Sequence, residues 1–160
     1  MTTLEAVRSA GGYIDAAKDF LKFSSLDNPL LVSLFTEQAA LCYLKARFPR
    51  QFAFQSILAG HQFNVSEQPH HSIRNYLNAK DVILDKGWKQ AELHVCESIG
   101  QHALSLGDNL KAEMHFNAAL ELSCGQNPAT LHNYFKTIKA NKQDKSECSI
   151  CLFLLINLCA

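Results

Sequence analysis

Cysteine and histidine are the residue types in this chain whose chemistry could support a metal or redox site. Cys148 and Cys151 are separated by two residues, which is the spacing of half a structural zinc site. Such a site needs four ligands, and no second cysteine pair follows, while His132 stands alone upstream. A thioredoxin-like pair would follow a strand and open a helix, and the sequence predicts no strand here. We therefore expect no metal or redox function, and a thiol or metalloenzyme that uses these three residues is the least favoured alternative.

The remaining histidines do not form a catalytic constellation. His70 and His71 are adjacent at the start of a predicted helix, and neighbouring residues on a helix face different directions. His94 and Cys96 could approach each other, but no acidic residue is placed to orient the histidine as a general base. The chain also lacks a glycine-rich phosphate loop and the motifs of metalloproteases and serine hydrolases. The sequence thus predicts a protein that is not an enzyme and that needs no cofactor and no metal.

Charge and composition narrow the possible functions further. The chain has 160 residues, with 15 lysines and arginines balanced by 15 aspartates and glutamates. A neutral chain lacks the basic excess that binds phosphates, so we expect no nucleic-acid partner. Apolar residues make up 48% of the chain and charged residues 19%, a composition typical of a folded domain. Residues 1–5 lack the features of a signal peptide, so we expect a cytoplasmic protein with reduced cysteines.

Prolines and glycines divide the chain into segments of helical length. Pro29, Pro49 and Pro69 suit the first turns of helices, and Gly87 and Gly107 suit their ends. Apolar residues between these points recur with a helical period, and no stretch shows the alternation of a strand. The predicted fold class is therefore all-α. The expected helices cover about residues 30–46, 49–63, 69–85, 88–106, 108–123 and 127–140, after an N-terminal helix and linker over residues 1–28.

A pattern of small and aromatic residues recurs along these helices. The small residues allow two helices to cross closely, and the aromatic ring fills the space between them. The spacing resembles a tetratricopeptide repeat, so the sequence predicts a tetratricopeptide-like α-solenoid of antiparallel helix pairs over residues 29–140. Its copies are offset by 33 and 40 residues, and an irregular helical bundle is the alternative. The repeat positions are Ala39, Tyr43 and Ala46 in the first copy, Gly60, Ser72, Tyr76 and Ala79 in the second, and Gly100, Ala112, Phe116 and Ala119 in the third.

Residues 141–160 differ in composition from the repeats. A polar stretch leads into the nearly unbroken apolar run from Ile150 to Ala160. This run is shorter than the approximately 20 residues of a membrane-spanning helix. Acylation of Cys148, Cys151 or Cys159 beside upstream lysines is one reading, and a segment outside the fold is the other. We expect the second, because the helical pattern stops before the tail begins.

A small basic and aromatic cluster surrounds Pro49. It contains Lys45, Arg47, Phe48 and Arg50. Such a cluster could contact an anionic partner or a lipid surface, although a solvated junction between two helices is the commoner situation. The sequence favours the solvated junction.

Several strings of residues resemble the TRAPP subunit 8 family of transport-particle proteins. The most specific are Ala59-Gly60-His61 and the segment from Gly87 to His94, and the resemblance extends over roughly residues 12–125. It implies an α-solenoid region of a much larger, cytoplasmic protein that lies peripherally at the Golgi. In that family the complex tethers vesicles and activates a Rab1-type GTPase in ER-to-Golgi traffic and autophagy. The exchange site belongs to other subunits, so no catalytic residue is implied, and His61 and His94 are expected to pack or hydrogen-bond inside the fold.

The resemblance and the absence of a catalytic motif predict a non-enzymatic scaffold segment of such a vesicle-tethering complex. Its partners would be other TRAPP subunits and, indirectly, a Rab1-type GTPase, with membrane association only through the complex. The alternative is a generic tetratricopeptide-like adaptor that binds a peptide or helix of a partner. A peptide-carboxylate clamp would need lysine, arginine and asparagine side chains facing the groove, and the sequence alone does not identify them.

Overall fold

A computed structural model describes residues 3–25, 27–84 and 86–123, together with the single positions His132, Lys136 and Lys139. Side chains are described within these ranges from Ala10 to Leu122. The described residues form six α-helices and one short 3-10 helix, with no strand among them, so the predicted all-α class is confirmed. The expected helix over 127–140 has only those three single positions described, all helical and exposed, and the tail 141–160 lies outside the described residues.

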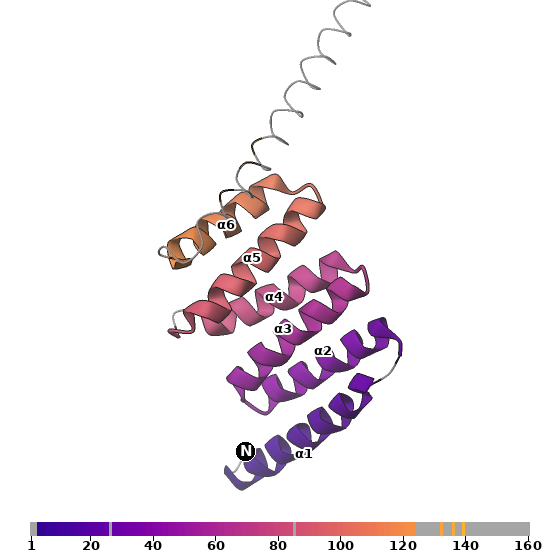
Figure 1. Cartoon of the computed structure of the whole chain (residues 1–160). Coiled ribbons are helices and arrows are strands. Elements are labelled where there is room, and N and C mark those ends of the chain that lie inside the picture. The colour runs from indigo at the N-terminus through magenta and orange to yellow at the C-terminus, as the bar shows by residue number, and fades with distance from the viewer. Residues whose placement is uncertain are drawn as a thin grey trace, which may run out of the picture.

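The helices stack one after another, so that each packs against its neighbours in the sequence. Successive helices run in opposite directions and form a zigzag from α1 at one end to α6 at the other (Figure 1). This is the arrangement of a helical solenoid, in which each layer buries one face against the next. The elements are α1 (Thr3–Lys22), η1 (Phe23–Ser25), α2 (Pro29–Lys45), α3 (Pro49–Val65), α4 (Pro69–Ile83), α5 (Lys89–Ser105) and α6 (Asn109–Ser123).

The helices after α1 begin at a constant interval. Their first residues are 29, 49, 69, 89 and 109, so each helix with its turn occupies 20 residues and each helix pair occupies 40. A tetratricopeptide repeat occupies about 34 residues. The solenoid predicted from the sequence is therefore present, but its helix pairs are longer than those of tetratricopeptide proteins.

The helix starts have local causes in the sequence. The Asn28 side chain accepts hydrogen bonds from the backbone N–H groups of Leu30 and Leu31, at 3.0 and 3.3 Å. These bonds satisfy donors that a helix start leaves without partners. Proline follows the cap residue of α2, α3 and α4, where its missing N–H is not needed. The Asp108 carboxylate accepts from the N–H of Lys111 at 3.1 Å and caps α6 as expected.

The turns share one backbone conformation at the same interval. A residue with positive φ occupies the third position before the next helix's second residue in every turn from α2 to α6: Arg47 at 63°, Glu67 at 56°, Gly87 at 77° and Gly107 at 76°. Glycine adopts this left-handed conformation readily, whereas other residues are strained in it. In three of the turns the following N–H bonds back across the helix end, as in a Schellman motif. These bonds run from Phe48 to the Tyr43 carbonyl, from Gln68 to the Phe63 carbonyl and from Asp108 to the Ala103 carbonyl, at 2.8–2.9 Å.

The core repeats with the same 20-residue interval. One position in each helix is completely buried, and in four of the five helices it is alanine. A small side chain at this position lets consecutive helices approach closely, and larger groups such as Tyr76 and Phe116 fill the remaining space. The five positions are Ala39, Ala59, Ala79, Ile99 and Ala119, each with an exposed fraction of 0%.

The structure places the first predicted repeat copy out of register with the other two. Ser72 and Ala112 lie three residues after the first residue of their helices, whereas Ala39 lies ten residues after the start of α2. Counted from the helix start, the residues of α2 that match the later copies are Val32, Thr36 and Ala39, and all three are buried. The pattern of Ala39, Tyr43 and Ala46 therefore recurs by sequence likeness rather than by position. The offset that the helices follow is 40 residues throughout.

Candidate functional site

The glycines of the second and third repeat copies hold helix pairs together. A β-carbon built on Gly100 would lie 2.5 Å from Cε1 of Phe116, and one built on Gly60 would lie 3.0 Å from the Tyr76 ring. The helices therefore approach so closely that the aromatic ring of one lies on the backbone of the other. The Ser72 hydroxyl adds a bond to the Gly60 carbonyl at 2.8 Å. These positions build the stack and present no chemistry to solvent.

The other repeat positions also lie inside the fold. Phe116 packs in a cluster with Cys96 and Ala103 of the facing helix. Tyr43 is half-buried. The remaining positions are buried: Ala39, Ala46, Ala79, Ala112 and Ala119.

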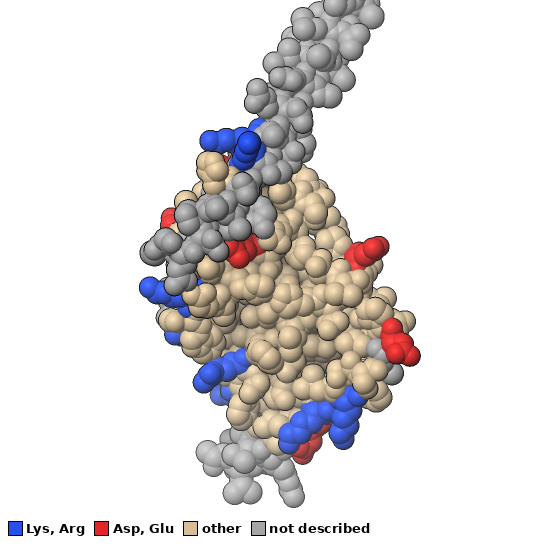
Figure 2. Space-filling view, viewed as in Figure 1, with Lys and Arg blue, Asp and Glu red and all other residues tan. Residues whose placement is uncertain are grey.

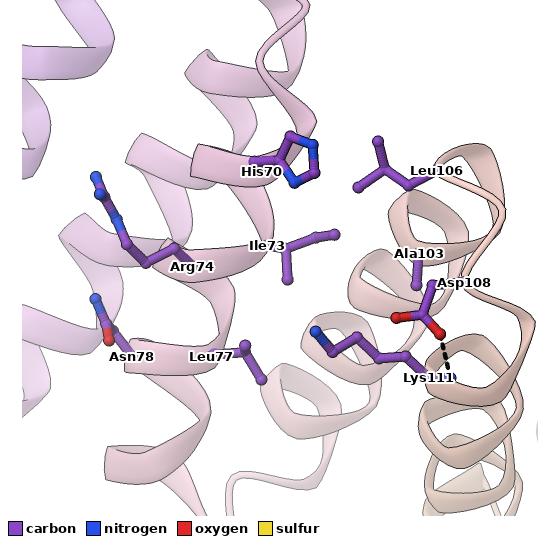
Figure 3. A pocket seen from close by; sticks show the side chains of 9 residues that line it. All are labelled: His70, Ile73, Arg74, Leu77, Asn78, Ala103, Leu106, Asp108 and Lys111. Carbon is purple, nitrogen blue, oxygen red and sulfur yellow. Dashed lines mark hydrogen bonds between the residues drawn. The ribbon is translucent and has the colours of Figure 1, made fainter.

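A groove opens between α4 and α6, beside the end of α5 (Figure 3). Its volume is about 490 Å³, within the range of typical ligand sites. The sequence analysis identified none of its polar residues, because they come from helices that only the stack brings together. The residues around it are His70, Ile73, Arg74, Leu77, Asn78, Ala103, Leu106, Asp108 and Lys111.

The charges of this groove are largely balanced. The guanidinium of Arg74 forms a salt bridge of 2.6 Å with the Glu37 carboxylate, which also accepts from the Asn75 amide at 3.0 Å. The Asp108 carboxylate lies across the groove from Arg74, beside Lys111 (Figure 3). The two cations of the groove thus have two carboxylates close to them. The arrangement can bind a polar peptide but has no strong preference for an anion.

Three histidines and a tyrosine form a second polar cluster, on α3, α4 and α5. The Tyr76 hydroxyl lies 2.9 Å from Nδ1 of His61, and Nε2 of His61 lies 3.1 Å from Nε2 of His94. The His102 ring stacks on Tyr76 with 5.8 Å between ring centroids. Burial and the neighbouring imidazole lower the pKa of His61 and the pKa of His102 below the ordinary histidine value.

The histidine cluster is suited to packing more than to catalysis. Its imidazoles are held neutral and hydrogen-bond to each other, as expected for His61 and His94. No described hydrogen bond or ring contact of the cluster involves a carboxylate that would orient a general base.

The described cysteines are not placed for nucleophilic chemistry. Cys42 and Cys96 are free thiols, and burial raises the pKa of Cys96, so its thiol stays protonated. His94 bonds to His61, whereas Cys96 packs in the core, so the structure does not pair them. Within the described part of the chain, no group of three histidine, cysteine or acidic residues could hold a metal ion. Cys148 and Cys151 lie outside it.

Membrane crossing was searched over the same part of the chain. No helix there combines the length and the apolar character that a membrane span requires.

The repeated 20-residue helical unit and the buried repeat positions define the class of the protein, which is an α-solenoid of antiparallel helices. The chain is 33% identical over 145 residues to trafficking protein particle complex subunit 8 from Homo sapiens. The match covers 87% of this chain and 10% of the human protein, so the chain spans about a tenth of its relative's length. No protein-family model matches the sequence. No solved structure matches it either. The chain is therefore related to a segment of subunit 8, which confirms the resemblance in the sequence.

Proposed function

We propose that this chain is a non-enzymatic scaffold segment of a TRAPP-type vesicle-tethering complex. The observation that carries the proposal is the 33% identity to trafficking protein particle complex subunit 8, which extends over 145 residues. An identity of that length spans most of the helical stack rather than one motif. The segment would act in ER-to-Golgi traffic and autophagy, where the complex would support activation of a Rab1-type GTPase.

The shape of the molecule supports a role in binding other proteins. A solenoid exposes a large surface relative to its core, and single helices present side chains along its edges. Large apolar side chains are exposed on several helices, with Val65 66% and Phe54 55% exposed. We propose other TRAPP subunits as the direct partners and the GTPase as an indirect one. The chain would be cytoplasmic and would lie peripherally at the Golgi through the complex, without binding nucleic acid.

The absence of catalysis belongs to the same proposal. Two groups with clearly shifted pKa values, Cys96 and His115, are both buried within the stack. Catalytic groups with shifted pKa values typically face a cleft, where a substrate can reach them. Buried groups of this kind support a structural role.

Affinity purification tests the scaffold function. The tagged 160-residue chain, a variant without residues 141–160 and full-length subunit 8 would be recovered from the same cells. We expect all three to recover other TRAPP subunits, with equal amounts for the two short chains. Recovery by full-length subunit 8 alone would show that the segment does not bind the complex by itself.

The groove between α4 and α6 favours a second candidate, an adaptor that binds a peptide. Arg74, Asn78 and Lys111 are the residue types of a carboxylate clamp, and the structure brings them to one groove. A peptide with a free C-terminal carboxylate would then bind more tightly than its amidated form, and Lys111→Gln would remove the difference. Equal binding of the two peptides would argue against the adaptor. The nearby carboxylates of Glu37 and Asp108 make this candidate the weaker one.

A further inference from the structure

Two adjoining hollows lie at the edge of the stack that carries the α2–α3 and α4–α5 turns. The larger, of about 680 Å³, is formed by residues at the start of α3, including Arg47, Phe48 and Arg50. The smaller, of about 210 Å³, has walls that include Ile57, Ile83 and Trp88. Arg50 and Phe54 belong to both hollows, which makes them one continuous depression. We call it the arginine groove, defined by Arg47, Phe48, Arg50, Phe54, Ile57 and Trp88.

The arginine groove has an apolar surface open to solvent. Phe54 is 55% exposed and Phe48 is 46% exposed, although both are large aromatic residues. Single exposed apolar residues are common, but a contiguous patch beside a hollow is typical of an interaction site. The aromatic walls therefore indicate a surface that a partner covers.

Arg50 is positioned at the centre of this surface. Its guanidinium lies over the Trp88 ring, 5.4 Å from the ring centroid. Stacking on an aromatic ring restricts the guanidinium without using its hydrogen-bond donors. The donors remain available to a carboxylate, which a planar guanidinium can bind through two parallel hydrogen bonds.

The charge around the groove has a single sign in the described part of the chain. None of the described residues that line either hollow is acidic, and no salt bridge to Arg47 or Arg50 occurs among the described residues. Exposed Lys86 and Lys89 lie in the adjacent α4–α5 turn. Figure 2 shows basic side chains on the left margin, where these two turns lie in Figure 1, and acidic side chains on the right margin.

The two grooves of the molecule therefore differ in what they can bind. In the groove between α4 and α6, Arg74 is already paired with Glu37, and Asp108 contributes a negative charge. In the arginine groove, the cations have no such partners among the described residues, so a carboxylate from another molecule would complete them. Charge complementarity thus assigns an acidic partner to the arginine groove.

We infer that the arginine groove binds an acidic peptide segment of a partner protein. The peptide would place one apolar side chain in the smaller hollow, and its aspartate or glutamate residues would bind Arg47 and Arg50. The smaller hollow is below the approximately 300–1,000 Å³ typical of small-molecule sites, so a single side chain suits it better than a cofactor. A concave anchor site also distinguishes a peptide from a flat lipid surface. The inference rests on the proposed scaffold function and names the chemistry of its partner.

Direct binding to the purified 160-residue chain tests the inference. The probes are a fluorescent helical peptide with one leucine among glutamates and the same peptide with glutamine in place of each glutamate. We expect the acidic peptide to bind and the neutral one to bind at least about tenfold more weakly. Arg50→Gln and Arg47→Gly should each weaken binding of the acidic peptide several-fold, and added salt should weaken it further.

Glu67→Gly is the matched control for Arg47→Gly. Both substitutions put glycine at a left-handed turn position, but Glu67 lies at the opposite edge of the stack. The control should therefore keep the affinity of the native chain. Circular dichroism of each variant checks that the helices are intact, and the Arg47 variant remains informative if the Arg50 variant does not fold.

Three results would overturn the inference: equal binding of the two peptides, unchanged affinity in both arginine variants, or the same loss in the Glu67 control. Binding to phosphatidylserine vesicles without binding to the acidic peptide would also overturn it, because the surface would then recognise a membrane. If the peptide fails to bind but the chain still recovers TRAPP subunits, the scaffold function stands without this groove. If the peptide binds but no subunit is recovered, the groove stands and the scaffold function does not.

Discussion

At the scale of single residues, the closest approach in the stack is between Gly100 and Phe116. Gly100 lies in the middle of α5, where glycine has a low helix propensity, so a local cause does not explain its presence. The Phe116 ring on its backbone does explain it, because a β-carbon would lie 2.5 Å from that ring. Gly12 in α1 has no atom within 4 Å of the corresponding position, so the two glycines make a matched pair.

Gly100→Ala should lower the free energy of unfolding by about 1–2 kcal/mol, because the fully buried Phe116 must shift. Gly12→Ala should raise it by about 0.5–1 kcal/mol, since alanine favours the helix and meets nothing there. Urea denaturation followed by circular dichroism measures both. A double variant, Gly100→Ala with Phe116→Leu, should recover part of the loss. Stabilisation by Gly100→Ala would contradict the close packing of α5 on α6.

His115 is the residue that couples this fold most strongly to pH. It is buried, and its Nδ1 has no hydrogen-bond partner. Burial, together with Lys80 and Lys111, lowers the pKa of His115 from 6.5 to about 4. Between these values the unfolded chain binds more protons than the folded chain, so stability rises with pH over this range.

The stabilising contribution of neutral His115 should be complete above about pH 6.5 and lost as the pH falls towards 4, by on the order of 2–3 kcal/mol. His115→Gln should flatten this part of the curve of unfolding free energy against pH. Exposed His70 offers the control, because His70→Gln should leave the slope unchanged. The same slope in native chain and His115→Gln would show that other groups, such as His61 and His102, dominate.

At the scale of the elements, the turns determine how the helices connect. Each turn from α2 to α6 contains a left-handed residue, and only two of these four residues are glycine. The left-handed conformation costs a non-glycine residue about 1–2 kcal/mol relative to the right-handed one. Arg47 and Glu67 therefore carry strain that Gly87 and Gly107 avoid.

Glu67→Gly should raise the free energy of unfolding by up to about 1 kcal/mol, because glycine adopts positive φ without a clash. Gly107→Ala should lower it by about 1 kcal/mol for the same reason. Thermal unfolding of the two variants beside the native chain gives the signs. Opposite signs at the two turns support the shared turn conformation, and destabilisation by Glu67→Gly would contradict it.

At the scale of the whole molecule, the stack is one-dimensional. Each helix packs against its neighbours in sequence, so the middle helices have neighbours on two sides. In the described part of α1, Ala17 is the buried apolar residue, whereas α3, α4 and α5 each bury several side chains. Stability should therefore decrease from the centre of the stack to its first helix.

Hydrogen exchange should show this gradient. Backbone amides of α1 should exchange faster than those of α3, α4 and α5, because the end of a solenoid opens without breaking the contacts of the middle. Mass spectrometry of exchanged peptides measures each helix separately. Uniform protection over all helices would instead indicate a single cooperative unit.

Much of the fold could be predicted because its signals are local. Asn28, the prolines at helix starts and Gly107 act within one turn of the chain, so the helix bounds agree with the sequence to within a few residues. The two glycine–aromatic pairs were also within reach, since the same 12-residue spacing separates Gly60 from Ser72 and Gly100 from Ala112. The left-handed turns at Arg47 and Glu67 could not be predicted, because neither residue type favours positive φ.

The sequence by itself determined an all-α chain of stacked helices, because caps, helix breakers and apolar period act over short distances. Only the tertiary structure decided which helix positions are equivalent, since the Ala39 pattern looks right in sequence and is wrong in register. It also decided where the surfaces lie: Arg50 meets Trp88, and Arg74 meets Lys111 across a groove, because the stack brings together residues from different helices. Contacts between distant segments depend on how every layer packs on the next, and no local pattern encodes that geometry.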